Sequence, residues 1–212
     1  MTAEDTSVNE PRPEAADDHA AAPHRWVVFG ATQPSRLAWA GLLAAGLALA
    51  GLVVQLRAGS PALGAFCLLA AVTPLLIAVD LAEHRLPDVI TLPLAGMCLI
   101  AVTAGAVFSG DWSMLVRAVM SSAGLTAVFG LLFFLGAGSG FGFGDVKLAL
   151  SMGLCLGAIA PPAVLIGPFL GFLLTAVVGL VLMLTGRATR SSAIALGPYL
   201  LAGTLIVIAT TG

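Results

Sequence analysis

Two aspartates stand where this chain is otherwise apolar. Asp145 ends the sequence Gly-Phe-Gly-Asp and opens one apolar stretch, and Asp80 closes another stretch 65 positions earlier. An ionisable side chain at the edge of a membrane helix is costly to place there and usually serves a function. Two facing carboxylates that share a proton could hydrolyse an amide bond, because one would activate water and the other would polarise the scissile carbonyl.

The composition indicates an integral membrane protein. Of 212 residues, 59% are hydrophobic and 9% are charged, whereas a soluble domain carries about 25% charged residues. The formal net charge of −2 gives no reason to expect a nucleic-acid partner. Residues 1–35 differ from the rest. They are rich in Ala, Pro and acidic residues and lack the features of a signal peptide, so we expect a disordered tail before a membrane domain over 36–212.

The apolar runs predict an all-α bundle of about seven transmembrane helices. A spanning helix needs about 20 residues, and the charge-free run from Leu148 to Gly186 has 39. Pro161-Pro162 divides that run, because proline removes a helix hydrogen bond and restricts the preceding residue. The predicted spans lie near 37–56, 62–80, 90–109, 115–136, 145–160, 163–185 and 193–211.

The distribution of positive charge predicts a cytoplasmic N-terminus. With seven spans, seven of the nine Lys and Arg residues fall on the N-terminal side and only Arg57 and Arg117 on the other. Positive residues concentrate on the cytoplasmic side of membrane proteins. The loops that hold Asp80 and Asp145 would then both face the cytoplasm, in a multi-pass protein of the plasma membrane.

The two aspartates are predicted at opposite kinds of helix end. Asp80 belongs to the last turn of its helix, where the macrodipole opposes a negative charge, and Asp145 lies at a helix start, where the dipole favours one. Such contrasting environments suit an acid–base pair, which would titrate as one coupled unit. An interfacial Asp80 paired with Arg85 or His84 is the structural alternative. Asp88, which follows Leu86-Pro87, is well placed to cap the next helix.

Five glycines at alternate positions precede Asp145, from Gly136 to Gly144. Glycine permits unusual backbone angles and close approach of another chain. The phosphate-loop pattern is absent, and no strand precedes the glycines. A flexible linker would not explain why they end at a carboxylate.

Cys67, Cys98 and Cys155 lie in apolar runs without a Cys-x-x-Cys pair. We therefore expect buried thiols and neither a metal nor a cofactor.

These residues resemble a known family. Asp80, Leu86-Pro-Asp88 and Thr91-Leu-Pro93, followed by Gly142-Phe-Gly-Asp-Val-Lys-Leu148, are similar to motifs of the type IV prepilin peptidases, membrane aspartyl proteases marked by Gly-x-Gly-Asp. Ile194-Ala-Leu-Gly-Pro-Tyr199 resembles the Gly-Pro segment of the family's last helix. The resemblance covers roughly residues 60–212.

The resemblance implies that Asp80 and Asp145 are the catalytic pair. Asp88 is the rival for the first role, but the family often has Asn at that position. The implied substrates are prepilins and pseudopilins, whose basic leader is removed at the cytoplasmic membrane face during pilus assembly or protein secretion. We expect the substrate to lie against Gly142, Phe143 and Gly144.

One departure from the family limits the implied activity. Longer members carry an N-terminal cytosolic insert with paired Cys-x-x-Cys and also N-methylate the new terminus. Because this chain lacks those cysteines, it resembles a short form restricted to cleavage. A transporter or proton channel that uses Asp80 and Asp145 as relay sites is an alternative, although transporters place such groups near the bilayer midplane. A non-enzymatic assembly subunit is a third. The particular pilin and the oligomeric state are left open.

Overall fold

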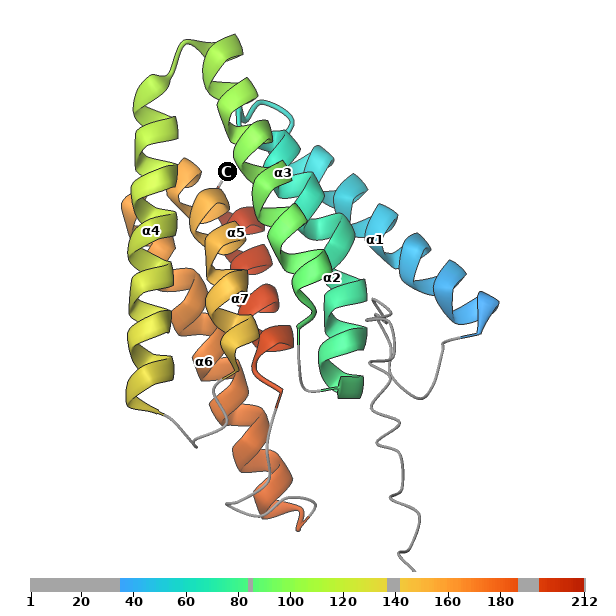
Figure 1. The fold of residues 1–212 in the computed structure, drawn as a ribbon. Helices are drawn as coiled ribbons and strands as arrows, with labels where there is room; N and C mark the ends of the chain where they lie inside the picture. Colours follow the sequence, from blue (N-terminus) through green and yellow to red (C-terminus); the bar gives the residue numbers. More distant parts are fainter. Residues whose placement is uncertain (1–34, 84–85, 137–141, 187–194, 212) are drawn as a thin grey trace, which may run out of the picture.

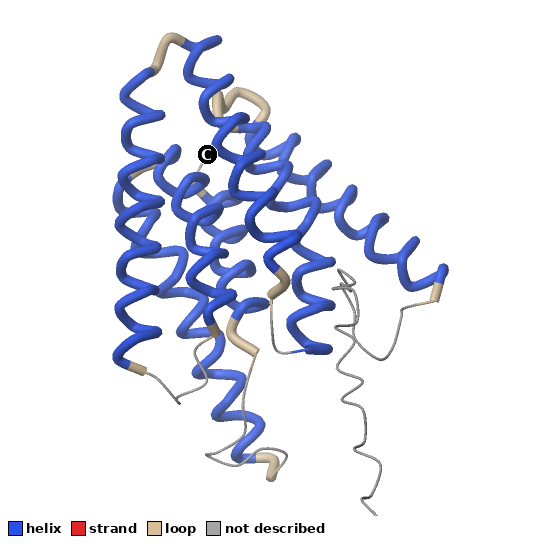
Figure 2. Tube along the Cα trace, viewed as in Figure 1, coloured by secondary structure: helices blue, strands red, loops and turns tan. Residues whose placement is uncertain are grey.

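The chain folds into a bundle of α-helices (Figures 1 and 2). The computed structural model describes residues 35–83, 86–136, 142–186 and 195–211, and in these ranges it contains no strand. Residues 1–34 of the predicted tail lie outside them. The helices are α1 (Arg36–Arg57), α2 (Leu63–Glu83), α3 (Asp88–Ser109), α4 (Trp112–Leu135), α5 (Phe143–Ile159), α6 (Pro161–Leu184) and α7 (Gly197–Thr210).

The all-α membrane class is confirmed. Five helices, α1 to α4 and α6, are long and apolar enough to cross a bilayer. Their exposed side chains are largely apolar, for example Leu47, Ile100 and Phe134, each at least 70% exposed. Such a surface suits lipid, since no aqueous protein exposes so many large apolar side chains. The remaining helices are shorter, with 17 residues in α5 and 14 in α7.

The predicted break at Pro161-Pro162 is present. Ala160 has an extended backbone (φ −165°, ψ 155°), and α6 starts at Pro161 itself. Proline is tolerated in the first turn because the N–H groups there have no partner within the helix, and its ring disfavours a helical conformation at the preceding residue. The two prolines therefore end α5 and begin α6 without an intervening loop.

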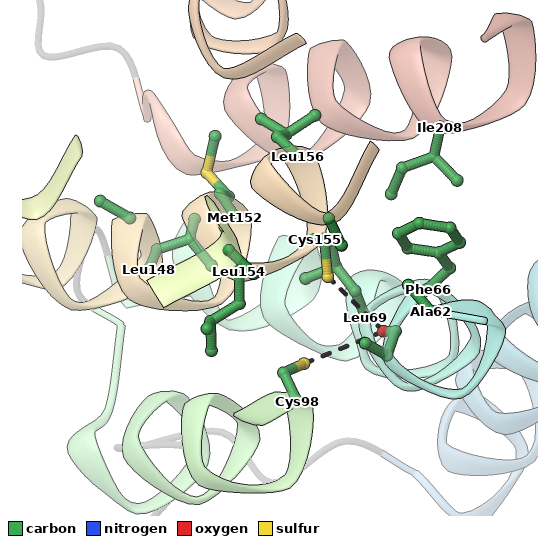
Figure 3. Packing of buried hydrophobic residues seen from close by; sticks show 14 of the residues in the cluster. Ala62, Phe66, Leu69, Cys98, Leu148, Met152, Leu154, Cys155, Leu156 and Ile208 are labelled. Carbon is green, nitrogen blue, oxygen red and sulfur yellow. Dashed lines mark hydrogen bonds between the residues drawn. The ribbon is translucent and has the colours of Figure 1, made fainter. Parts of the chain in front are cut away.

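Helix α5 is the centre of the bundle. It packs against α2, α3, α4, α6 and α7, and 12 of its 17 residues are buried. Figure 3 shows Met152 and Leu156 of this helix in one core with Phe66 and Ile208. Because protein rather than lipid covers α5, side chains on every face of this helix are positioned by neighbours.

Two of the cysteines lie inside this core. The Cys98 and Cys155 thiols both point at the backbone carbonyl of Ala65, at 3.9 and 3.7 Å, and donate to it (Figure 3). Cys67 is partly buried and donates to the Ala50 carbonyl at 3.8 Å. The expectation of buried thiols is therefore confirmed for Cys98 and Cys155, which link α3 and α5 to α2.

Small residues allow α6 and α7 to pack backbone to backbone. A Cβ placed on Gly203 would overlap the Gly167 carbonyl and lie 2.6 Å from the Gly171 nitrogen. Small residues at such spacing are typical of helix contacts in membranes, where close packing replaces the hydrophobic driving force. Gly167 and Gly171 of α6 therefore form a close contact with Gly203 of α7.

We expect Gly203→Ala to destabilise the protein by about 1–3 kcal/mol, because its added methyl group must push α6 and α7 apart. Gly96→Ala is the matched control, since a Cβ there meets nothing within 4 Å and alanine favours the helix by about 1 kcal/mol. Thermal unfolding in detergent should show a lower midpoint for the first variant only. Equal midpoints would contradict the close packing of α6 and α7.

Candidate active site

Asp80 lies in the last turn of α2, as predicted from its position after an apolar run. Its side chain points into the bundle and is only 6% exposed, although Leu81 beside it is 57% exposed. A carboxylate at this helix end faces unpaired backbone carbonyls, so the macrodipole disfavours its ionised form.

Asp145 is the third residue of α5 and is likewise 6% exposed. Its carboxylate accepts a hydrogen bond from the backbone N–H of Gly142 at 3.3 Å, and its own N–H donates to the Gly142 carbonyl at 3.0 Å. This reciprocal pair satisfies donors that a helix start would otherwise leave open. Asp145 therefore lies in the first turn of α5, where the helix dipole favours a negatively charged side chain.

The bundle brings these two helix ends to the same site. Leu86, which is buried on the connection between α2 and α3, touches residues next to both carboxylates. A Cβ on Gly144 would come 2.8 Å from the Leu86 Cβ. The sequence indicated the two carboxylates but gave no sign that Leu86 would pack beside Gly144.

Gly197 is a site neighbour that the sequence reasoning did not include among the functional residues. A Cβ on Gly197 would lie 2.7 Å from Asp80 Oδ2 and 3.5 Å from the Leu86 Cδ1. Only glycine lets the start of α7 approach this carboxylate so closely. The available signal was the Gly197-Pro198 pair, because proline suits the first turn of a helix and α7 does begin there, at 197 rather than near 193.

The three residues expected to meet substrate have different surroundings. Gly142 caps α5, and Gly144 packs against Leu86. Phe143 is 52% exposed, and its ring lies 5.5 Å, centroid to centroid, from that of Phe133. Of the three, only Phe143 presents a side chain to the outside of the site.

Asp88 differs from Asp80 in position and in partner. The expectation that it caps α3 is wrong, because Pro87 is the N-cap and Asp88 is the first helical residue. Its side chain is 56% exposed and forms an ion pair with Lys147 of α5. The Lys147 Nζ also lies 4.5 Å above the centroid of the Phe143 ring. Pro87 has an extended backbone (φ −70°, ψ 135°), and the Asp88 carboxylate lies against Lys147 of α5.

Among the buried residues that the structure describes, Asp80 and Asp145 are the charged ones. Within the described ranges, no group of three or more His, Cys, Asp or Glu side chains could hold a metal ion. His84 and Arg85, the alternative partners considered for Asp80, lie outside the described residues. Two buried carboxylates with opposite helix polarity can supply one proton acceptor and one proton donor, which is what hydrolysis of an amide by activated water requires.

The Asp88–Lys147 pair is open to a direct test. We expect a double-mutant cycle with Asp88→Asn and Lys147→Met to give a coupling energy of about 0.2–1 kcal/mol, as for other solvent-accessible ion pairs. Unfolding in detergent at low and high salt would measure it, and salt should reduce it. Asp88→Asn combined with Arg36→Gln is the control and should be additive. Zero coupling in the first cycle would contradict the pairing.

Comparison with known proteins places the chain among leader peptidases. A model described as the type IV leader peptidase family matches residues 66–184, which include Asp80 and Asp145. A prepilin leader peptidase/N-methyltransferase of Burkholderia pseudomallei is 35% identical over 164 residues, which are 76% of this chain and 50% of that protein.

Shorter matches agree with this result. The proteins of the same name from Pseudomonas aeruginosa and Aeromonas hydrophila are 33% and 35% identical over 123 residues, which are 58% of this chain and 41% of each relative. The chain thus spans about half the length, or less, of the curated relatives that it matches. No solved structure matches it. Because the family model covers more than half of the sequence and includes both buried aspartates, the chain belongs to the type IV leader peptidase family.

Proposed function

We propose that this membrane protein is an aspartyl endopeptidase that removes the leader from type IV prepilins or pseudopilins. The observation that carries the proposal is the burial of Asp80 and Asp145 at helix ends that Leu86 joins, since Leu86 packs against Gly144 beside Asp145 and close to Gly197 beside Asp80. Family membership supports the same reaction, since the relatives are named as prepilin leader peptidases. The proposal covers cleavage of the leader and does not extend to N-methylation of the new terminus.

The helix polarity suggests the role of each carboxylate. Asp145, at the favourable start of α5, would be ionised and take a proton from water as that water attacks the scissile carbonyl. Asp80, at the unfavourable end of α2, would be protonated and donate to the carbonyl oxygen. When the tetrahedral intermediate collapses, Asp145 returns its proton to the leaving amine and Asp80 regains one from the intermediate's hydroxyl. The pair ends with one proton, as it began.

Burial favours Asp80 over Asp88 as the partner of Asp145. The Asp88 carboxylate is 56% exposed and is paired with Lys147, whereas Asp80 is 6% exposed. A general acid must lie close to the base with which it shares a substrate, and the buried Asp80 meets this condition together with Asp145. We therefore assign Asp88 to positioning α5 through Lys147.

The substrate would approach through the membrane. Prepilins present an apolar helix after their leader, and such a helix can pack on the apolar outer surface of the bundle with its end at the aspartates. Phe143 is exposed near Asp145 and offers an apolar contact, and the glycines on either side of it, Gly142 and Gly144, carry no side chain. We therefore retain Gly142, Phe143 and Gly144 as proposed substrate contacts.

The charge distribution supports a cytoplasmic site in the plasma membrane. Asp80 and Asp145 lie at the same end of the bundle as Arg36 and Lys147, and seven of the nine basic residues belong to that side of the chain. By the positive-inside rule, this end faces the cytoplasm. The transporter alternative is not favoured, because the carboxylates are at helix ends rather than on broken helices at mid-depth.

We expect Asp80→Asn and Asp145→Asn each to reduce the cleavage rate roughly 10²–10⁴-fold or more, the range for loss of a general acid or base. Asp88→Asn should retain most of the activity, because it loses only an exposed ion pair. The assay would follow release of the leader from a full-length prepilin reconstituted with the enzyme in liposomes.

Asparagine is nearly isosteric with aspartate, so all three variants should unfold at similar temperatures, which would control for loss of fold. Loss of activity in Asp88→Asn with retention in Asp80→Asn would transfer the first catalytic role to Asp88. Full activity in both Asp80→Asn and Asp145→Asn would favour a non-enzymatic subunit.

A further inference from the structure

A second polar site lies at the other end of the bundle from the aspartates. There the structure has a partly open cavity of 440 Å³, lined by Arg57, Ser60, Asp111, Arg117, Ala158 and Thr211 among others. It adjoins the end of α1, the start of α4 and the last turns of α5 and α7. Because α2 and α5 carry the aspartates at their opposite ends, the length of the bundle separates this cavity from the site described above.

The two arginines approach the cavity from different helices and use few of their donors on protein. Arg57 Nη1 donates to the Thr211 carbonyl at the end of α7. Arg117 makes two long hydrogen bonds, to Ser113 Oγ at 3.4 Å and to the Ala158 carbonyl at 3.5 Å. A guanidinium has five N–H donors. Among the described residues, no carboxylate oxygen lies within 4.0 Å of a nitrogen of either side chain.

Among the described residues that line the cavity, the side-chain charge is positive on balance. Asp111 is the acidic side chain in the lining, and its carboxylate is already engaged: it accepts from Ser113 Oγ at 2.6 Å and from the Met114 N–H at 3.0 Å, which caps α4. The cavity therefore holds two guanidiniums and one carboxylate, which already accepts two hydrogen bonds and lies near Arg117. Like charges held near each other at a membrane surface favour an anion between them.

The sequence gives independent reason to look for such an anion. Only Arg57 and Arg117 depart from the charge asymmetry that otherwise places Lys and Arg on the aspartate side. They are 60 positions apart in the chain, yet both line the same cavity. Capping the carbonyl ends of α5 and α7 explains one hydrogen bond for each arginine, but a neutral donor could do the same.

We propose that this cavity binds a phosphate-bearing anion, held by the guanidiniums of Arg57 and Arg117. Arginine is suited to phosphate because its planar fork donates two parallel hydrogen bonds to the oxygens. The cavity lies at a helix end, at the level of lipid head groups, and Trp112 and Leu56 are exposed beside it. Tryptophan is typical of this interface, and basic pockets between membrane helices bind anionic head groups.

The same chemistry could be supplied by an anionic phospholipid or by free inorganic phosphate. The inference does not depend on the proposed peptidase activity, because none of these residues lies near Asp80 or Asp145. Arg36 lies at the opposite end of α1 and does not line the cavity, so its substitution should leave anion binding unchanged. It therefore provides a control on the same helix as Arg57.

The test measures the unfolding midpoint of the full chain in a zwitterionic detergent while one ligand is titrated. One arm uses short-chain phosphatidylglycerol, a second uses short-chain phosphatidylcholine, and a third uses inorganic phosphate. We expect phosphatidylglycerol or phosphate to raise the midpoint of the wild type and of Arg36→Gln saturably, and phosphatidylcholine to have little effect. Response to phosphatidylglycerol alone identifies a lipid head group, and an equal response to phosphate identifies the free anion.

The pocket variants decide between binding and helix capping. Arg57→Gln and Arg117→Gln keep an N–H donor for the helix carbonyls but lose the charge, so the apparent Kd should rise about tenfold or more, as for loss of a charged hydrogen bond. If either variant fails to fold, Arg57→Lys and Arg117→Lys retain the charge without the fork, and binding should weaken several-fold. Unchanged ligand response in these variants, or no response in the wild type, would overturn the proposal.

Discussion

The structure depends on keeping two carboxylates inside an apolar bundle. Asp80 and Asp145 are each 6% exposed, and an isolated ionised carboxylate loses several kcal/mol when it leaves water. The surrounding architecture reduces that cost in two ways. The start of α5 supplies positive helix polarity and a backbone N–H to Asp145, and a proton shared with Asp80 would leave one negative charge rather than two. The proposed hydrolysis needs the same proton arrangement, so the condition for burying the pair would also be the condition for catalysis.

Close backbone approach makes this placement possible. Gly197 admits the start of α7 beside Asp80, and Gly144 admits the Leu86 side chain beside Asp145. With a side chain at either position, the helix ends would separate and water would enter between them. Gly144 and Gly197 are thus needed for close approach of the helix ends, just as other glycines are needed for the close packing of α6 against α7.

Helix α5 links the two ends of the molecule. Its first turn holds Asp145, and the Ala158 carbonyl in its last turn accepts from Arg117, so an acidic side chain lies at its start and a basic one at its end, which is the order that the macrodipole favours. Protein surrounds this helix on all sides, which explains why 17 residues suffice while the lipid-facing helices have 21 to 24. The long outer helices shield it, and the polar chemistry is confined to the two ends.

The sequence was sufficient to predict what depends on local pattern. The apolar runs predicted the helices, Pro161-Pro162 predicted the break, and the positions of Asp80 and Asp145 at run ends predicted one charged site. It was insufficient for features that depend on how distant segments meet. Leu86, Gly144 and Gly197 belong to three segments that are distant in the sequence and lie together only in the fold. Asp88 was expected to cap α3 because its ion pair with Lys147 forms only where α3 lies beside α5. The cavity lined by Arg57 and Arg117 could not be predicted for the same reason, because the two arginines come from different helices.

The central claim is that Asp80 and Asp145 work as one coupled pair with a single shared proton, and the pH dependence of prepilin cleavage tests it most directly. Activity should rise with pH as the pair loses its first proton, reach a maximum while one proton remains, and fall as the second proton leaves. The profile should be measured in liposomes over the range in which thermal unfolding shows an intact fold. A rate that does not change through the acidic range, or that rises without a later fall, would contradict the shared-proton account.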